Sequence, residues 1–198
     1  MIAGGHATRY AGTPKGLLAV GGVRILDRVA DALSDATGSA PALFANAPDA
    51  ADWRPGLAVF PDVVPGIGAL GGILTAVETL GAAVCVAWDM PFVPAALLRD
   101  LASGLAYADV VIPESNGSPR GVEPLCAAYG PACGPAIRAA LARGDQRAIG
   151  FHADVRVTRL PAARVLMYGD PDVLFFNVNT AEDLQHAEVV CRARDSSR

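Results

Sequence analysis

The feature that most constrains the fold is a regular alternation of short apolar runs with stretches of helical periodicity. Apolar side chains recur at i, i+3, i+4 and i+7 over residues 26–33 and 70–77, which predicts two helices with one buried face each. Further helices are expected over residues 94–105 and 137–143, and from Thr180 onward, where Thr-x-x-Asp has the spacing of a helix cap. Strands are expected between the helices at residues 42–45, 57–60, 82–88, 110–112, 125–129, 155–160 and 173–176.

Buried strands that alternate with helices form βαβ units, in which a mostly parallel sheet is covered on both faces. The chain has 198 residues and is 52% hydrophobic, which is enough for one domain with a sizeable core. We therefore expect an α/β fold of three layers, α/β/α and Rossmann-like, over residues 1–198, with a frayed tail at 191–198. Only Met1–Ala3 precede the first glycines, so either the first strand is a stub or the true start lies upstream.

Composition excludes several classes of partner. The net charge of −4 gives no general attraction for nucleic acid or for an anionic membrane. No apolar run approaches the ~20 residues that span a bilayer, and no signal peptide is evident. The four cysteines lack Cys-x-x-Cys spacing, and Cys85 and Cys126 lie in apolar runs that are typical of a core. These observations predict a cytoplasmic protein without nucleic-acid or membrane partners.

Lys15 is the single lysine of a chain with sixteen basic residues, so the other fifteen are arginine. A lysine retained against that bias suggests a position that needs a compact ammonium rather than a planar guanidinium. Gly4 and Gly5 follow a short apolar start, and their backbone N–H groups could face an anion. Together these residues predict a loop that grips a triphosphate. It is not a Walker A loop, because Lys15 lies between Pro14 and Gly16.

Three polar residues follow predicted strands: Asn46, Asp62 and Asp89. In an open parallel sheet, ligands bind beyond the carboxyl ends of the strands. We therefore expect these side chains and the Gly4–Gly5 loop to meet at one edge of the sheet.

A second motif favours a different function. Gly66-Ile-Gly-Ala-Leu-Gly71, with Asp89 further along, matches the dinucleotide fingerprint of nicotinamide-dependent oxidoreductases. That fingerprint requires a strand to run directly into its first glycine, whereas Pro65 stands before Gly66. It also leaves Lys15 and the first glycines unexplained, so it ranks below the triphosphate loop.

The arrangement of motifs resembles the molybdenum cofactor guanylyltransferase family along nearly the whole chain. The resemblance rests on Ala3–Gly5, Arg9, Gly12-x-x-Lys15-Gly-Leu17, Pro61-Asp62, Gly68–Gly72, Trp88–Pro94, Glu123–Tyr129 and Asn177–Asp183. The sequence departs from the family pattern at Tyr10, where methionine is usual, and at Pro14, where an acid is usual. The resemblance implies a nucleotidyltransferase fold.

The resemblance also implies a reaction. GMP would be transferred from GTP to a molybdopterin-type cofactor, with release of pyrophosphate. Lys15, Arg9 and Asp89 would be catalytic, with Asp89 holding Mg²⁺, a cation that one or two carboxylates and substrate phosphates commonly bind. The nucleotide would contact Ile2, Ala3, Gly4, Gly5, Lys15, Asn46, Asp62 and Asp89.

On the same resemblance, Asn177 and Asn179 would face the acceptor cofactor. Transient contact with molybdoenzymes or cofactor-handling proteins would follow from such a role. Cytidylyl transfer to the same cofactor is the nearest alternative, ahead of another NTP-dependent nucleotidyltransferase and of an NAD(P)-dependent oxidoreductase. A nucleotide-binding module that has lost turnover is a further alternative of a different class.

Overall fold

The computed structural model describes residues 1–3 and 13–196. Its helices are α1 (Ile25–Thr37), α2 (Ala69–Leu80), α3 (Ala95–Gly104), α4 (Cys133–Ala142), α5 (Ala162–Val165), α6 (Pro171–Leu174) and α7 (Ala181–Asp195). The strands are β1 (Ala19–Val20), β2 (Val23–Arg24), β3 (Ala42–Phe44), β4 (Ala58–Phe60), β5 (Ala83–Val86), β6 (Val110–Pro113), β7 (Cys126–Tyr129) and β8 (Val157–Leu160). Three short 3-10 helices are η1 (Lys15–Leu17), η2 (Ala50–Asp52) and η3 (His152–Asp154).

The N-terminal residues join two groups of strands into one layer. Strands β3 and β4 pair in parallel, while β5, β7, β6 and β8 pair in that order. Ile2 forms parallel bridges to Phe44 on one side and to Ala87 on the other. The N–H of Ile2 donates to the Val86 carbonyl at 2.9 Å, and the N–H of Ala3 donates to the Phe44 carbonyl at 2.9 Å. Residues 1–3 are therefore a short central element between β3 and β5.

Strand β7 runs against the direction of its neighbours. It pairs antiparallel with both β5 and β6, whereas β6 pairs in parallel with β8. The expected mostly parallel sheet is confirmed, with β7 reversed in it. This reversal matters for the site, because it brings the amino end of β7 to the edge where β5 ends.

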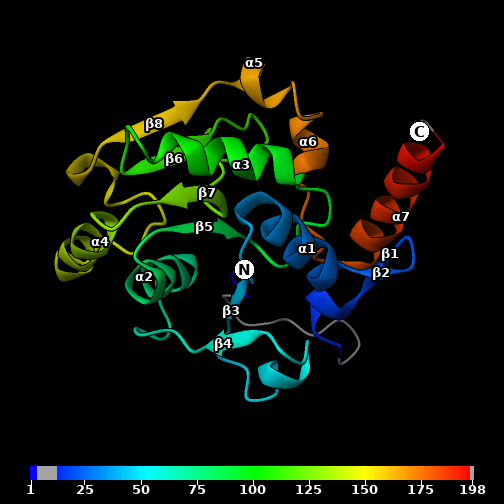
Figure 1. The fold of residues 1–198 in the computed structure, drawn as a ribbon, viewed down its shortest axis with the longest axis horizontal. Helices are drawn as coiled ribbons and strands as arrows, with labels where there is room; N and C mark the ends of the chain where they lie inside the picture. The colour runs from blue at the N-terminus through cyan, green and yellow to red at the C-terminus, as the bar shows by residue number, and fades with distance from the viewer. Residues whose placement is uncertain (4–12, 197–198) are drawn as a thin grey trace.

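Successive strand residues face two different helical layers. Val86, Val111 and Ala128 belong to a core cluster with residues of α1, α3 and α7, whereas their neighbours Cys85 and Val110 belong to a cluster with residues of α2 and α4. Figure 1 shows α1 and α3 lying together, and α2 beside α4. This alternation, which follows from the period of two along a strand, gives the expected three α/β/α layers.

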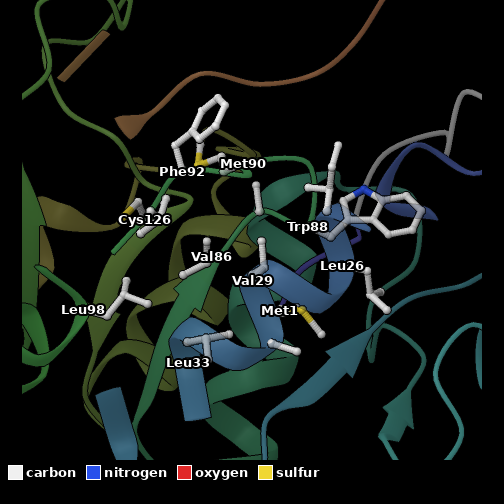
Figure 2. Packing of buried hydrophobic residues seen from close by; sticks show 14 of the residues in the cluster. Met1, Leu26, Val29, Leu33, Val86, Trp88, Met90, Phe92, Leu98 and Cys126 are labelled. Carbon is white, nitrogen blue, oxygen red and sulfur yellow. The ribbon is translucent and has the colours of Figure 1, made fainter. Parts of the chain in front are cut away.

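Figure 2 shows the first of these clusters, with Val29 and Leu33 of α1 near Val86 of β5, and Leu26 of the same helix on the side of Trp88. These three leucine and valine positions lie in the helical stripe that the sequence predicts, and each is buried. Truncating such a side chain to alanine costs about 2–5 kcal/mol in a well-packed core. Cys85 and Cys126 are buried as expected.

The structure corrects one predicted element and adds another. Residues 173–176 are not a strand, because Pro171–Leu174 forms α6. Asp170 starts this helix by accepting the Asp172 N–H at 3.0 Å, and Pro171 occupies its first turn. The added element is the β1–β2 hairpin, whose turn uses Gly21 and Gly22 at φ of 59° and 75°.

The C-terminal helix begins where the sequence predicts. Thr180 Oγ1 accepts the Asp183 N–H at 3.1 Å and Asp183 accepts the Thr180 N–H at 2.8 Å, which is the reciprocal pair of a capping box. The helix runs to Asp195, so the segment that we expected to fray begins inside it. Across residues 1–3 and 13–196, no helix is both long and apolar enough to cross a bilayer.

Candidate functional site

Lys15 meets a residue from the far end of the chain. Its Nζ donates a hydrogen bond of 2.8 Å to Oδ1 of Asn179. The N–H of Asn179 donates to Oδ2 of Asp183 at 2.9 Å, so the cap of α7 holds the asparagine in place. Two residues that the sequence singled out separately, Lys15 and Asn179, are therefore brought together.

Asp89 lies beside the same segment. It follows β5, and its backbone carbonyl accepts the Val178 N–H at 3.0 Å. Burial raises the pKa of the Asp89 carboxyl, while a backbone hydrogen bond and the nearby Lys15 charge act in the opposite direction. Asp89, Lys15 and the residues around Val178 thus form one polar group at the end of β5.

Glu123 is a member of this group that sequence reasoning missed as a site residue. Val86 pairs with Cys126 across β5 and β7, and the Ala87 N–H donates to the Leu125 carbonyl at 2.8 Å. Asp89 follows β5 and Glu123 precedes β7, and their carboxylates lie close enough for the two charges to interact.

The electrostatics of Glu123 agree with that position. Burial raises the pKa of the Glu123 carboxyl, a hydrogen bond from the Leu125 backbone lowers it, and the negative charge of Asp89 raises it further. The signal in the sequence is an acid just before a buried strand. A parallel sheet places polar residues of this edge after its strands, whereas the reversed β7 places Glu123 before its strand.

Asn46 and Asp62 form a second polar pair, at the ends of β3 and β4. Asn46 Nδ2 donates to Asp62 Oδ2 at 2.7 Å, and the Asp62 N–H donates to Asn46 Oδ1 at 2.8 Å. Asp62 is buried, whereas Asn46 is exposed. The sheet order places this pair on the opposite side of Ile2 from Asp89, so the two polar groups flank the N-terminal segment.

Glycines let α2 approach both the pair and the N-terminal segment. A Cβ on Gly72 would lie 2.6 Å from Ile2 Cγ2, and a Cβ on Gly71 would lie 3.0 Å from the Val64 carbonyl and 3.5 Å from Asp62 Oδ2. Gly68 adopts a φ of 64° immediately before the helix. These glycines are therefore accounted for by packing, and residues 61–68 separate β4 from the helix, unlike in a dinucleotide fingerprint.

The predicted phosphate loop lies largely outside the residues that the structure describes. Gly4, Gly5 and Arg9 lie outside the described residues. The N–H of Ala3 is committed to the Phe44 carbonyl. The sheet therefore already uses this N–H, and the predicted contact of Ala3 with the nucleotide stays a prediction.

Asn177 lines a cavity beside the polar group at the end of β5. Its Nδ2 donates to the Phe175 carbonyl at 3.1 Å. A cavity of about 300 Å³ is lined by Asn177 and Glu123, by Ser115, Gly117, Ser118 and Pro119 of the β6–β7 connection, and by Pro171, Asp172, Phe175 and Phe176. This cavity adjoins the acidic end of the site through Glu123.

The donor set suits a hard cation and an anionic substrate. Across the described residues, no group of three or more histidine, cysteine, aspartate or glutamate side chains is placed to hold a metal. Mg²⁺ needs only one or two carboxylates, because it is completed by water and substrate phosphates. The carboxylates of Asp89 and Glu123, beside the ammonium of Lys15, fit that mode of binding.

Comparison with known proteins agrees with the fold and the arrangement of motifs. The family model described as the MobA-like NTP transferase domain matches residues 1–157. A probable molybdenum cofactor guanylyltransferase from Pelotomaculum thermopropionicum is 33% identical, covering 100% of this chain and 95% of the relative. The molybdenum cofactor guanylyltransferase of Desulfosudis oleivorans is 32% identical, covering 98% of this chain and 95% of the relative.

Comparison with solved structures agrees with the fold. Molybdopterin-guanine dinucleotide biosynthesis protein A from Archaeoglobus fulgidus is 25% identical and superposes with a TM-score of 0.79, covering 97% of both chains. A 2-C-methyl-D-erythritol 4-phosphate cytidylyltransferase from Thermus thermophilus, 19% identical with a TM-score of 0.64 over 90% of this chain and 94% of its own, shares the fold. The chain therefore belongs to the MobA-like NTP transferase family and is a nucleotidyltransferase similar to the molybdenum cofactor guanylyltransferases.

Proposed function

We propose that this protein transfers GMP from GTP to a molybdopterin-type cofactor and releases pyrophosphate. The observation that carries the proposal is the bond between Lys15 and Asn179 beside Asp89. It joins the lysine of the predicted triphosphate loop to the segment that we assign to the acceptor. Full-length similarity to guanylyltransferases supports the same reaction.

The chemical step requires two anions to approach each other. An acceptor phosphate oxygen attacks the α-phosphorus of GTP, a new oxygen–phosphorus bond forms, and the bond to the β-phosphate oxygen breaks to release pyrophosphate. Charge neutralisation and in-line positioning dominate such a step. Lys15 supplies a point charge for the phosphates of the leaving group. Arg9 is proposed to form a fork onto phosphate oxygens.

Asp89 is the proposed ligand of Mg²⁺. The residues fit the ion, because a cation would relieve the cost of two carboxylates that burial and mutual repulsion disfavour. When bound, the ion would neutralise charge on the triphosphate. Glu123, which precedes the neighbouring strand β7, would also face the Mg²⁺ ion and help to hold the ion or its water.

The nucleoside is assigned to the Asn46–Asp62 side. The glycines of α2 allow close approach there, and Asp62 has a carboxylate already fixed by Asn46. Guanine presents two adjacent N–H donors, which a carboxylate can accept, and the ribose hydroxyls are the other candidates for Asp62. Gly4 and Gly5 remain the proposed contacts of the phosphates, and Ile2 and Ala3 the adjoining contacts of the nucleotide.

The acceptor is assigned to the opposite side, with Asn179 next to Lys15 and Asn177 at the cavity below α6. Phe175 and Phe176 give that cavity apolar walls, while Glu123 and Asn177 give it polar groups. A mixed lining of this kind suits a planar heterocycle that carries hydrogen-bonding groups.

Cytidylyl transfer to the same acceptor is the nearest rival reaction. Melting curves with each nucleoside triphosphate and Mg²⁺ test the assignment, since a ligand that binds the folded state raises the melting temperature by mass action. We expect GTP to raise it well above the effect of CTP or ATP at equal concentration. A larger shift with CTP would move the protein to cytidylyl transfer.

A further inference from the structure

Gly16 lies against the indole ring of Trp88. A Cβ built on Gly16 would overlap Cε3 of Trp88 and lie 2.8 Å from Cδ2 and 3.0 Å from Cζ3. Gly16 is not among the glycines with a positive φ. The lack of a side chain at residue 16 is therefore demanded by Trp88 rather than by the backbone conformation.

Trp88 is itself held from two other directions. Its ring stacks on Trp53, with centroids 4.8 Å apart and planes inclined by 19°. Its backbone N–H donates to the Ile2 carbonyl at 3.2 Å. Both tryptophan residues are 4% exposed, so each ring is confined by its neighbours. In Figure 2, Trp88 lies at one edge of the labelled side chains.

Gly16 and Trp88 are each adjacent in the sequence to a proposed catalytic residue. Lys15 comes immediately before Gly16, and Asp89 comes immediately after Trp88. We propose that Trp88 is a positioning residue, whose ring, backed by Trp53 and pressed against Gly16, fixes the separation between the Lys15 ammonium and the Asp89 carboxylate. The inference rests on the proposed function for the roles of these two residues, but the contact itself does not depend on the nucleotide or acceptor.

The physical reason is that the reaction depends on small displacements. A misplacement of about 1 Å in reacting groups can cost on the order of 100-fold in rate. The Lys15–Asn179 bond holds the end of the lysine side chain, but it does not fix η1 against β5. The flat face of Trp88 supplies that constraint, because a rigid ring against a glycine permits only one distance of approach.

A double-mutant cycle tests this role. Gly16→Ala keeps Trp88 but forces η1 away from it, and Trp88→Leu removes the surface against which Gly16 packs. We expect each variant to lower kcat by 10-fold or more, a larger factor than any rise in KM for GTP. Combining them gives the added methyl the space that the indole vacated, so the double variant should be at least 3-fold more active than Gly16→Ala.

Matched controls separate positioning from general loss of packing. Phe151→Leu removes a fully buried ring from the other core cluster and should leave kcat within 3-fold of the wild type. Trp88→Phe retains a flat ring and should recover most of the activity that Trp88→Leu loses. Melting curves confirm that the variants compared are folded.

The only two tryptophans of the chain are those in the stack, which provides a signal independent of turnover. Inorganic tripolyphosphate, titrated with Mg²⁺, should change tryptophan emission in the wild type, and Gly16→Ala should weaken its binding by 3-fold or more. Strictly additive effects in the cycle, or wild-type kcat in both single variants, would overturn the inference. If the wild type itself fails to transfer GMP, the proposed function fails, and unchanged tripolyphosphate binding in Gly16→Ala overturns the positioning role separately.

Discussion

Lys15 and Asn179 are 164 positions apart in the chain, yet Nζ of the lysine donates to Oδ1 of the asparagine at 2.8 Å. The asparagine is in turn fixed by Asp183 of the α7 cap. The position of the lysine therefore depends on a helix start near the other end of the chain. This bond crosses the place where we propose that nucleotide and acceptor meet.

The first prediction concerns the lysine. Lys15→Arg keeps the charge but replaces a compact ammonium with a planar fork that cannot take the same position between Asn179 and a phosphate. We expect kcat to fall by at least 100-fold in Lys15→Arg and further in Lys15→Ala, with melting temperatures close to the wild type. Steady-state kinetics on purified variants checks this, and near-wild-type turnover in Lys15→Arg would remove the special role of the lysine.

The second prediction concerns Asp89. Burial raises the pKa of its carboxyl, so ionised Asp89 lowers the stability of the metal-free protein at neutral pH. Asp89→Asn should abolish turnover and yet melt no lower than the wild type without metal. Added Mg²⁺ with GTP should stabilise the wild type but not the variant. Activity of the wild type in excess chelator would contradict the metal assignment.

The third prediction concerns the base or ribose. Asp62→Ala removes the carboxylate that Asn46 holds at 2.7 Å and should weaken GTP binding by about 1–3 kcal/mol, the scale of a lost buried or charged hydrogen bond. Asn46→Ala is the partner variant, because it loosens the same carboxylate without deleting it, so its effect should be smaller. Calorimetric titration with GTP measures both. Unchanged affinity in Asp62→Ala would exclude the residue from the site.

The fourth prediction concerns stability against pH. Burial lowers the pKa of His152 to about 4, while an unfolded histidine titrates near pH ~6.5. The unfolded state therefore binds the extra proton first, and the folded state loses stability as the pH falls from about 6.5 towards 4. The loss should stay below about 3 kcal/mol, because solvent still reaches part of the ring.

His152→Phe isolates this effect, because it keeps an aromatic ring against Phe151, whose centroid lies 4.9 Å away. Urea unfolding at pH 7 and pH 5 should show a smaller loss of stability in the variant than in the wild type. Equal losses in the two proteins would show that another group is responsible.

The parts of the site that the sequence predicted are those encoded locally. Asp89 was found because a polar residue directly follows a buried strand, and the α7 cap was found because its two partners lie three residues apart. Glu123 was missed because its place depends on the reversed direction of β7, which is set by pairing with β5 and β6 rather than by residues 126–129 themselves.

Other differences have the same origin in competing local and tertiary effects. The run from Val173 to Phe176 has the composition of a strand, but the Asp170 cap and Pro171 start a helix there. The Lys15–Asn179 bond joins two segments that are distant in the sequence, and hydrophobic periodicity carries no information about such a contact. The contact of Gly16 with Trp88 likewise depends on the fold, which brings η1 against the residues that follow β5.

A competition for the acceptor tests the proposed transfer of GMP directly. The protein is incubated with a molybdopterin-type cofactor, Mg²⁺ and equal concentrations of GTP, CTP and ATP, and the nucleotide attached to the product is released and identified. A site that hydrogen-bonds one base rejects the others, because its polar groups would be left unpaired. For the proposed transfer we expect GMP in large excess, with one pyrophosphate formed for each product. A predominance of CMP, or pyrophosphate release without attachment of a nucleotide to the cofactor, would contradict it.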